Sequence, residues 1–202
     1  MSARATMRGI RPRPAGAGRR GQSLVEFALI VPVLAVILTS VMEFGLAFDT
    51  NLMLEAAARQ GSRVGAEMGN YGDKGVCPNT PAATNVDPSI VTAVQASLTN
   101  AGVKLTSVQI RIYLPDANGS STSSYNTWAW STTPTPHFTE TYHNWDACGR
   151  HDGTFGGGTF DSIGVQVTYT YTSVTGILGF FTGGLPMTAT AIMPIGPPWT
   201  FQ

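Results

Sequence analysis

Residues 19–38, RRGQSLVEFALIVPVLAVIL, begin with two arginines and a glycine and then become almost wholly apolar. Between residues 24 and 42 the only charged side chain is that of Glu26. A helix of this length covers about 28 Å, which is close to the hydrocarbon thickness of a bilayer. An ordinary secretory signal has a shorter apolar core followed by a small-residue cleavage site, and no such site follows here. We therefore expect a retained membrane anchor.

The charges of the chain are distributed unevenly around this anchor. The formal net charge is zero, from 12 basic and 12 acidic residues. Before residue 22, however, the only charged residues are six arginines: Arg4, Arg8, Arg11, Arg13, Arg19 and Arg20. Positive charge beside a membrane segment marks the cytoplasmic side, so we expect a cytoplasmic N-terminus and an extracytoplasmic remainder. The basic stretch is short and adjoins the apolar run, which favours this interpretation over nucleic-acid binding.

Glu26 requires an explanation, because a carboxylate near the bilayer interior is costly and usually has a partner or a task. One interpretation is an interfacial glutamate that the N-terminal end of the helix dipole stabilises. The other starts from Gly21. Cleavage after Gly21 would place a new α-amino group on Gln22, one helical turn from Glu26, where it would neutralise the acid of the same or a neighbouring subunit.

A basic leader that ends in glycine, followed by an apolar helix with glutamate at its fifth position, resembles the type IV prepilin class. The stretches RRGQSLVEFALIVPVL, VMEFGLAF and AAARQGSRVGA resemble more closely the TadE-like family, the minor pseudopilins of tight-adherence (Tad) pilus systems. This resemblance covers residues 19–66. Phe27 departs from the tyrosine that more often follows the glutamate in Flp-type pilins, but it keeps an aromatic ring. The resemblance implies a prepilin peptidase, other pilins or pseudopilins and a pilus assembly platform as partners.

Pro32 lies inside the apolar run, where it removes one backbone donor and crowds the carbonyl of Ala28. We therefore expect a kink in the helix at this position. Pilin-class helices also tend to carry such a proline.

Helical periodicity continues beyond residue 42, which predicts one helix over residues 22–69. Apolar residues recur every four positions from Phe44, and a polar side is supplied by Glu43, Asp49, Glu55, Arg59 and Arg63. Small residues also recur every four positions, at Ala57, Gly61, Gly65 and Gly69. Such a ridge allows close approach of another backbone, either of the protein's own sheet or of a second subunit.

Residues 70–202 are expected to form a small extracytoplasmic α+β domain with a second helix and a three-stranded antiparallel sheet. Asp87 as N-cap and Pro88 at the first helical position predict a helix that ends at Gly102. Alternating apolar residues predict strands in KLTSVQIRIYL (104–114) and DSIGVQVTYTYT (161–172), and a weaker strand near residues 187–193. The fold class is thus α+β, with the anchor helix continuing into the domain.

A long insert, residues 115–160, separates the first two predicted strands. It is rich in aromatic residues: Trp128, Trp130, Phe138, Tyr142, Trp145 and Phe155. These side chains would either fill a local core or form a recognition surface. Cys77 and Cys148 are the only cysteines, and we expect them to form a disulfide in an oxidising exterior; two free thiols or a metal pair are the alternatives.

The sequence does not indicate an enzyme. The stretch 137–152 holds the three histidines, His137, His143 and His151, with Glu140, Asp146, Cys148 and Asp152 close by. Their spacing matches no standard zinc pattern, and neither a nucleophile elbow nor a phosphate loop is present. We expect no metal and no cofactor. The apolar turn TGILGFFTGGL, residues 175–185, would enter the core, touch the membrane surface or dock on another subunit.

These observations predict a single-pass membrane protein with a cytoplasmic leader, residues 1–21, and membrane lipid around its helix. The preferred hypothesis is a minor pseudopilin that a prepilin peptidase cleaves after Gly21. Two rivals remain at this point: an uncleaved, signal-anchored surface binding or adhesive domain, and an anchored metal-dependent enzyme that uses residues 137–152.

Overall fold

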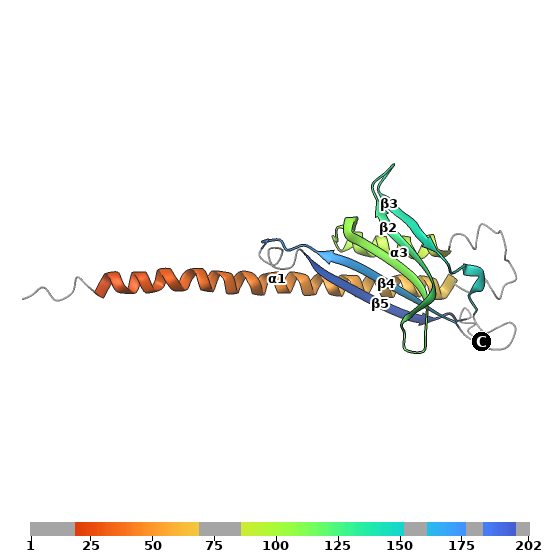
Figure 1. Ribbon diagram of the computed structural model, residues 1–202, viewed down its shortest axis with the longest axis horizontal. Coiled ribbons are helices and arrows are strands. Elements are labelled where there is room, and N and C mark those ends of the chain that lie inside the picture. The colour runs from red at the N-terminus through yellow and green to blue at the C-terminus, as the bar shows by residue number, and fades with distance from the viewer. Residues whose placement is uncertain (1–18, 69–85, 152–160, 177–183, 197–202) are drawn as a thin grey trace, which may run out of the picture. The chain divides into compact units, whose positions relative to one another are not determined.

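The structure is a computed structural model that describes residues 19–68, 86–151, 161–176 and 184–196. The chain divides into two compact units, Met1–Met42 and Glu43–Gln202. We call the second of them the α+β unit. Helix α1 (Arg19–Met68) begins in the first unit and ends in the second (Figure 1).

In the first unit, α1 presents an apolar surface that no described part of the protein covers. Its large side chains between residues 24 and 42 are exposed, among them Leu24 at 70% and Phe27 at 68%. Within the described residues, α1 is the one helix that is long and apolar enough to cross a membrane. The helix continues through Pro32 without a break in its assignment, and the expected kink stays a prediction.

The α+β unit contains α3 (Val86–Asn100), two short 3-10 helices, η1 (Leu105–Ser107) and η2 (Ala147–Gly149), and an antiparallel sheet. The strands are β1 (Val108–Pro115), β2 (Ser121–Ser131), β3 (His137–His143), β4 (Ser162–Tyr171) and β5 (Leu185–Pro194). Their order across the sheet is β3-β2-β1-β4-β5 (Figure 1). The α+β class and the three expected strands are confirmed.

The prediction of only three strands is wrong, because the described residues form five. The two further strands, β2 and β3, lie in the stretch 115–160 that the sequence presented as an insert. β2 pairs with β1 along its length, with Ile110 opposite Trp128 and Ile112 opposite Asn126. The supposed insert is therefore an extension of the sheet, and β3 forms one of its edges.

One face of the sheet packs against α1 and α3, and the alternating residues of β1 and β4 supply the centre of this core. The fully buried side chains include Ile110, Ile112, Ile163, Val165 and Val167. Three residues of the small-residue ridge on α1, Ala57, Gly61 and Gly65, face the same core, and Gly69 lies outside the described residues. A Cβ atom at Gly61 would lie 2.5 Å from Val94 Cγ2 of α3 and 3.2 Å from Val165 Cγ1 of β4. Of the two alternatives for the ridge, packing against the protein's own sheet and helix is thus confirmed.

The aromatic residues of β2, of β3 and of the segment between β3 and η2 mostly extend this core. Phe138 and Trp145 are buried, and Trp128 and Trp130 are partly buried against the same cluster. Trp130 and Phe138 meet edge to face, with ring centroids 5.1 Å apart. Tyr142 is exposed and stacks on Tyr125. Phe155 lies outside the described residues. The described aromatics therefore serve mainly as core, as the first of the two alternatives expected.

Candidate assembly site

The predicted processing residues lie in the first turns of α1. Gln22 Nε2 donates a hydrogen bond to Glu26 Oε1 at 3.2 Å, so these residues share one face of the helix, one turn apart. At Gly21, no described atom lies within 4 Å of the position that a Cβ would occupy. The glycine is thus not required by packing in the described structure. The cleavage role of Gly21 and the charge-pairing role of Glu26 stay predictions.

Glu43, the first residue after the apolar segment 24–42, is buried, with 1% of its surface exposed. Its carboxylate accepts hydrogen bonds from the backbone N–H of Thr175, at 2.5 Å, and from Tyr171 Oη, at 3.1 Å. Hydrogen bonds from the side chain and backbone of Thr175 lower the pKa of Glu43, against the opposing effect of burial. The sequence placed Glu43 on the polar side of the helix. That placement is wrong, because the residue joins α1 to the end of β4 and the loop after it.

A second buried polar group holds the N-terminal end of α3 against the sheet. Arg150 is fully buried, and its Nη1 atom lies 2.8 Å from Asp87 Oδ1. The two groups form an ion pair, but these two atoms are not aligned as a hydrogen bond. Asn126 Nδ2 donates to Asp87 Oδ2 at 2.6 Å and to the Trp145 carbonyl at 2.8 Å. Asn126 Oδ1 accepts from the backbone N–H groups of Asn144 and Trp145. This network explains why a charged pair is tolerated in the interior.

Asp87 therefore has a different role from the expected helix cap. Helix α3 begins at Val86, and the Asp87 carboxylate turns toward Asn126 and Arg150. Sequence reasoning missed the network, since its members are far apart in the chain and polar residues are ordinarily exposed. The one sign of this network in the sequence was Arg150, within the stretch 137–152.

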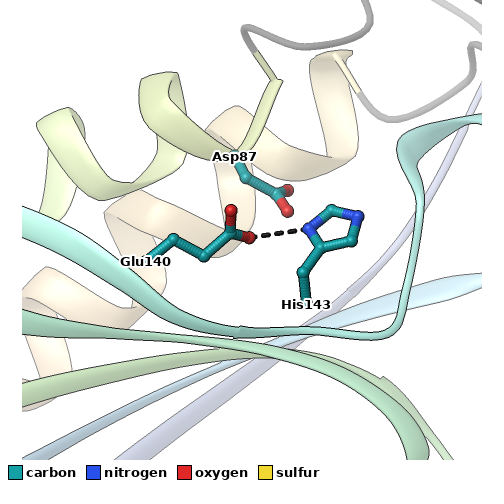
Figure 2. Close-up of side chains that lie close together, drawn as sticks. All are labelled: Asp87, Glu140 and His143. Atoms are coloured by element: carbon teal, nitrogen blue, oxygen red, sulfur yellow. Dashed lines mark hydrogen bonds and ion pairs between the residues drawn. The ribbon is translucent and has the colours of Figure 1, made fainter.

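Part of the predicted 137–152 cluster does come together. Figure 2 shows Glu140 and His143 of β3 beside Asp87, with His143 Nδ1 2.7 Å from Glu140 Oε1. One ligand atom from each residue lies within 4.8 Å of the others, and two carboxylates with an imidazole form a donor set that suits zinc or manganese. Both Asp87 oxygens, however, already contact donors of Arg150 or Asn126. We therefore describe these residues as a polar contact between α3 and β3.

The described histidines and acids among the remaining members do not join Glu140 and His143. His137 lies at the other end of β3, where its ring contacts the Thr135 carbonyl and the Thr139 hydroxyl. Cys148 belongs to η2, whereas Cys77 lies outside the described residues. The expected disulfide between them has no support from the structure and stays a prediction. Asp152 also lies outside the described residues.

The fold and its N-terminal surface define a class of protein: a single-pass, membrane-anchored protein whose anchor helix continues into an α+β unit. The TadE-like protein family model matches residues 21–63, which lie within α1. The resemblance to the TadE-like family is therefore confirmed over this part of the chain. The family suggests a membrane-anchored protein associated with Tad pili and is generally non-enzymatic. No curated protein and no solved structure matches the chain.

Proposed function

We propose that the protein is a minor pseudopilin that takes part in assembling a Tad-type pilus or a related secretion or adhesion apparatus. Residues 1–21 form a cytoplasmic leader, and a prepilin peptidase removes it by cleavage after Gly21. The α+β unit lies on the extracytoplasmic side. The observation that carries the proposal is the contact between Gln22 and Glu26 within the helix that matches the TadE-like family.

The physical argument concerns the charge of Glu26. In the intact chain, the one partner of the Glu26 carboxylate among the described residues is the neutral side-chain amide of Gln22. After cleavage, residue 22 carries an α-ammonium group, which attracts a carboxylate one turn away or on a neighbouring subunit. In a low-dielectric surrounding this attraction is much stronger than in water. Assembly would therefore favour a subunit that has been cleaved over one that retains its leader.

Cleavage is tested by mass spectrometry of the full chain purified from membranes that contain a prepilin peptidase. We expect a mature protein that begins at Gln22. The variant Gly21→Leu should retain residues 1–21, because it replaces the glycine that we assign as the cleavage position. Gly45→Leu is the matched control: Gly45 also lies in α1 with no described atom within 4 Å of a Cβ, so its mature mass should differ only by the substitution. An intact leader in the unsubstituted protein would favour the uncleaved adhesive domain.

Assembly is tested separately with Glu26→Gln, which keeps the shape of the side chain and removes its charge. We expect this variant to be cleaved and to accumulate in the membrane, with a loss of pilus material from the extracellular fraction. Glu55→Gln is the control, since the exposed ion pair of Glu55 with Arg59, 2.8 Å long, contributes little to stability. Pilus production that is normal with Glu26→Gln would refute the charge-pairing role.

A further inference from the structure

The sheet has a second face, opposite the one that packs against α1 and α3, and a hollow lies on it. On β1, Arg111 lies between the buried Ile110 and Ile112, so its side chain belongs to this second face. The hollow has a volume of about 350 Å³, and amides, hydroxyls and two tyrosine rings of β1, β2, β3 and β4 line it beside Arg111. None of the described lining residues belongs to the apolar turn 175–185, of which residues 177–183 lie outside the described structure.

Arg111 is held in place by the two tyrosines of the hollow. Its guanidinium carbon lies 3.7 Å from the centroid of the Tyr125 ring, a cation–π contact. Tyr142 of β3 stacks on Tyr125, with ring centroids 4.7 Å apart. The guanidinium is thus ordered before any ligand arrives, which lowers the entropy cost of binding.

Arg111 also has no counter-charge among the described residues. The ion pairs of the described structure join other residues. Its Nε atom is buried without a hydrogen-bond partner, and no described hydrogen bond uses its two Nη atoms. A donor left in this state is unfavourable, and a negatively charged acceptor from outside would satisfy it. A carboxylate suits the guanidinium best, because the two planar groups bind through parallel hydrogen bonds.

The groups around Arg111 favour a sugar as the bearer of this carboxylate. The amides of Gln109 and Gln166 and the hydroxyl of Thr168 both donate and accept hydrogen bonds, as the hydroxyls of a sugar require. Tyr142, exposed at 43%, offers apolar ring surface against which a sugar can pack.

Two other kinds of ligand fit the hollow less well. A peptide needs a sheet edge for its main chain or an apolar groove for its side chains, whereas the hollow lies over the central strand β1 and its lining is mainly polar. A nucleic acid carries closely spaced phosphates and is bound by several cations, whereas Arg111 is the one cation among the described lining residues.

We propose that this hollow binds a glycan through one acidic sugar, a hexuronic or sialic acid, whose carboxylate pairs with Arg111. The sugar packs against Tyr142, and the amides of Gln109 and Gln166 bind its hydroxyls. A volume of about 350 Å³ is within the range of ligand sites and accommodates one such sugar. The site gives the α+β unit a binding function that is independent of leader cleavage and of subunit assembly.

Binding is tested by saturation-transfer difference NMR of the full chain, in a detergent that has neither a sugar nor a carboxylate. The probes are the methyl glycosides of glucuronic, galacturonic and N-acetylneuraminic acid, and their methyl esters, which keep the ring and lose the charge. We expect at least one acid to bind, and its ester to bind about tenfold more weakly or less, because hydrogen bonds to a charged group are lost. Absence of binding by all three acids would overturn the proposal. Acetate that competes as well as the bound acid would reveal a plain carboxylate site, such as an acidic side chain of another protein would occupy, and would overturn the assignment to a sugar.

Two variants locate the binding on this face. Arg111→Gln removes the charge and should weaken binding about tenfold or more. Tyr142→Ala removes an exposed ring on the edge strand β3 and should weaken it about 2- to 10-fold. Arg59→Gln is the matched control, the same change at an arginine whose side chain is 66% exposed on α1, and it should bind as the unsubstituted protein does.

The fold of each variant is checked by far-ultraviolet circular dichroism. Unchanged affinity in a folded Arg111→Gln or Tyr142→Ala variant would contradict the site. An equal loss in Arg59→Gln would show a non-specific effect of charge and would contradict it as well. Tyr142→Ala decides the matter if Arg111→Gln does not fold, since the Tyr142 ring lies outside the core.

Discussion

Replacing Gly61 by alanine should destabilise the α+β unit relative to the same replacement at Gly45. Both glycines lie in α1, so alanine improves the helix propensity at each by about 1 kcal/mol. At Gly61, however, the new methyl group would lie 2.5 Å from Val94 Cγ2 and 3.2 Å from Val165 Cγ1. Valine side chains are stiff, so the helices must move apart, at a cost of about 1–3 kcal/mol. At Gly45 no described atom lies within 4 Å of the new group.

The propensity gain cancels when the two variants are compared, and the packing cost remains. For a unit of this size, 1 kcal/mol corresponds to about 2–4 °C in Tm, so Gly61→Ala should melt about 2–12 °C below Gly45→Ala. The measurement is thermal unfolding of the full chain in detergent, monitored by far-ultraviolet circular dichroism. Equal Tm values, or a higher Tm for Gly61→Ala, would show that α1 does not pack closely against α3 and β4 at this point.

Three further predictions concern the polar groups of the α+β unit. Asp87→Asn should lower the free energy of unfolding by about 3–5 kcal/mol, because it leaves Arg150 buried without its counter-charge. Chemical denaturation measures this loss, and the double variant with Arg150→Met should recover part of it. Because Thr175 holds the pKa of Glu43 below its ordinary value of about 4.5, the carboxylate stabilises the fold above that value, and the stabilisation is lost as pH falls through the lowered pKa. The fall in Tm in this acidic range should be smaller for Glu43→Gln, and an equal fall would exclude the contribution of Glu43. A chelator such as EDTA should leave Tm unchanged, since one Asp87 oxygen accepts a hydrogen bond from Asn126 and the other is ion-paired with Arg150. A fall in Tm with EDTA that is absent in His143→Ala would instead reveal a metal bound by Asp87, Glu140 and His143 (Figure 2).

The elements with a clear period were predictable from the sequence. The alternation of β1 and β4 identified the strands and their buried faces, since each strand has one face against the core. The four-residue spacing of Gly61 and Gly65 identified the close contact on α1, because a side chain at either position would collide with α3 or β4. These features depend on residues near one another in the chain, and a periodic pattern records them directly.

The strand β2 was not predictable in the same way, because its inward residues include the polar Asn126 among the tryptophans. Its hydrophobic alternation is therefore weak, and its serines and threonines resemble those of a loop. One signal did exist. Asn118-Gly119 follows β1 in the turn that precedes β2, where Asp116 Oδ1 accepts from the backbone of Asn118 and Ser120 and Gly119 adopts a φ of 80°. Such a pair between alternating stretches is typical of a hairpin.

The contacts of Glu43 and Arg150 lay beyond sequence reasoning for a different reason. Each buried charge is compensated by groups far away in the chain: Glu43 by Tyr171 and Thr175, and Arg150 by Asp87. A sequence pattern assigns charged residues to solvent, because that is where most of them lie. Only the folded chain shows which charged residues are held inside by partners.

The turn between β2 and β3 offers a practical consequence of the sheet order. Residues 132–136, TTPTP, are all exposed, and the two strands that they join lie at one edge of the sheet, away from β4 and β5. A short epitope or fluorophore-binding peptide inserted there would leave the register of the central strands intact. Living cells that carry such a tagged chain would allow individual copies to be followed from the membrane to whatever structure they join.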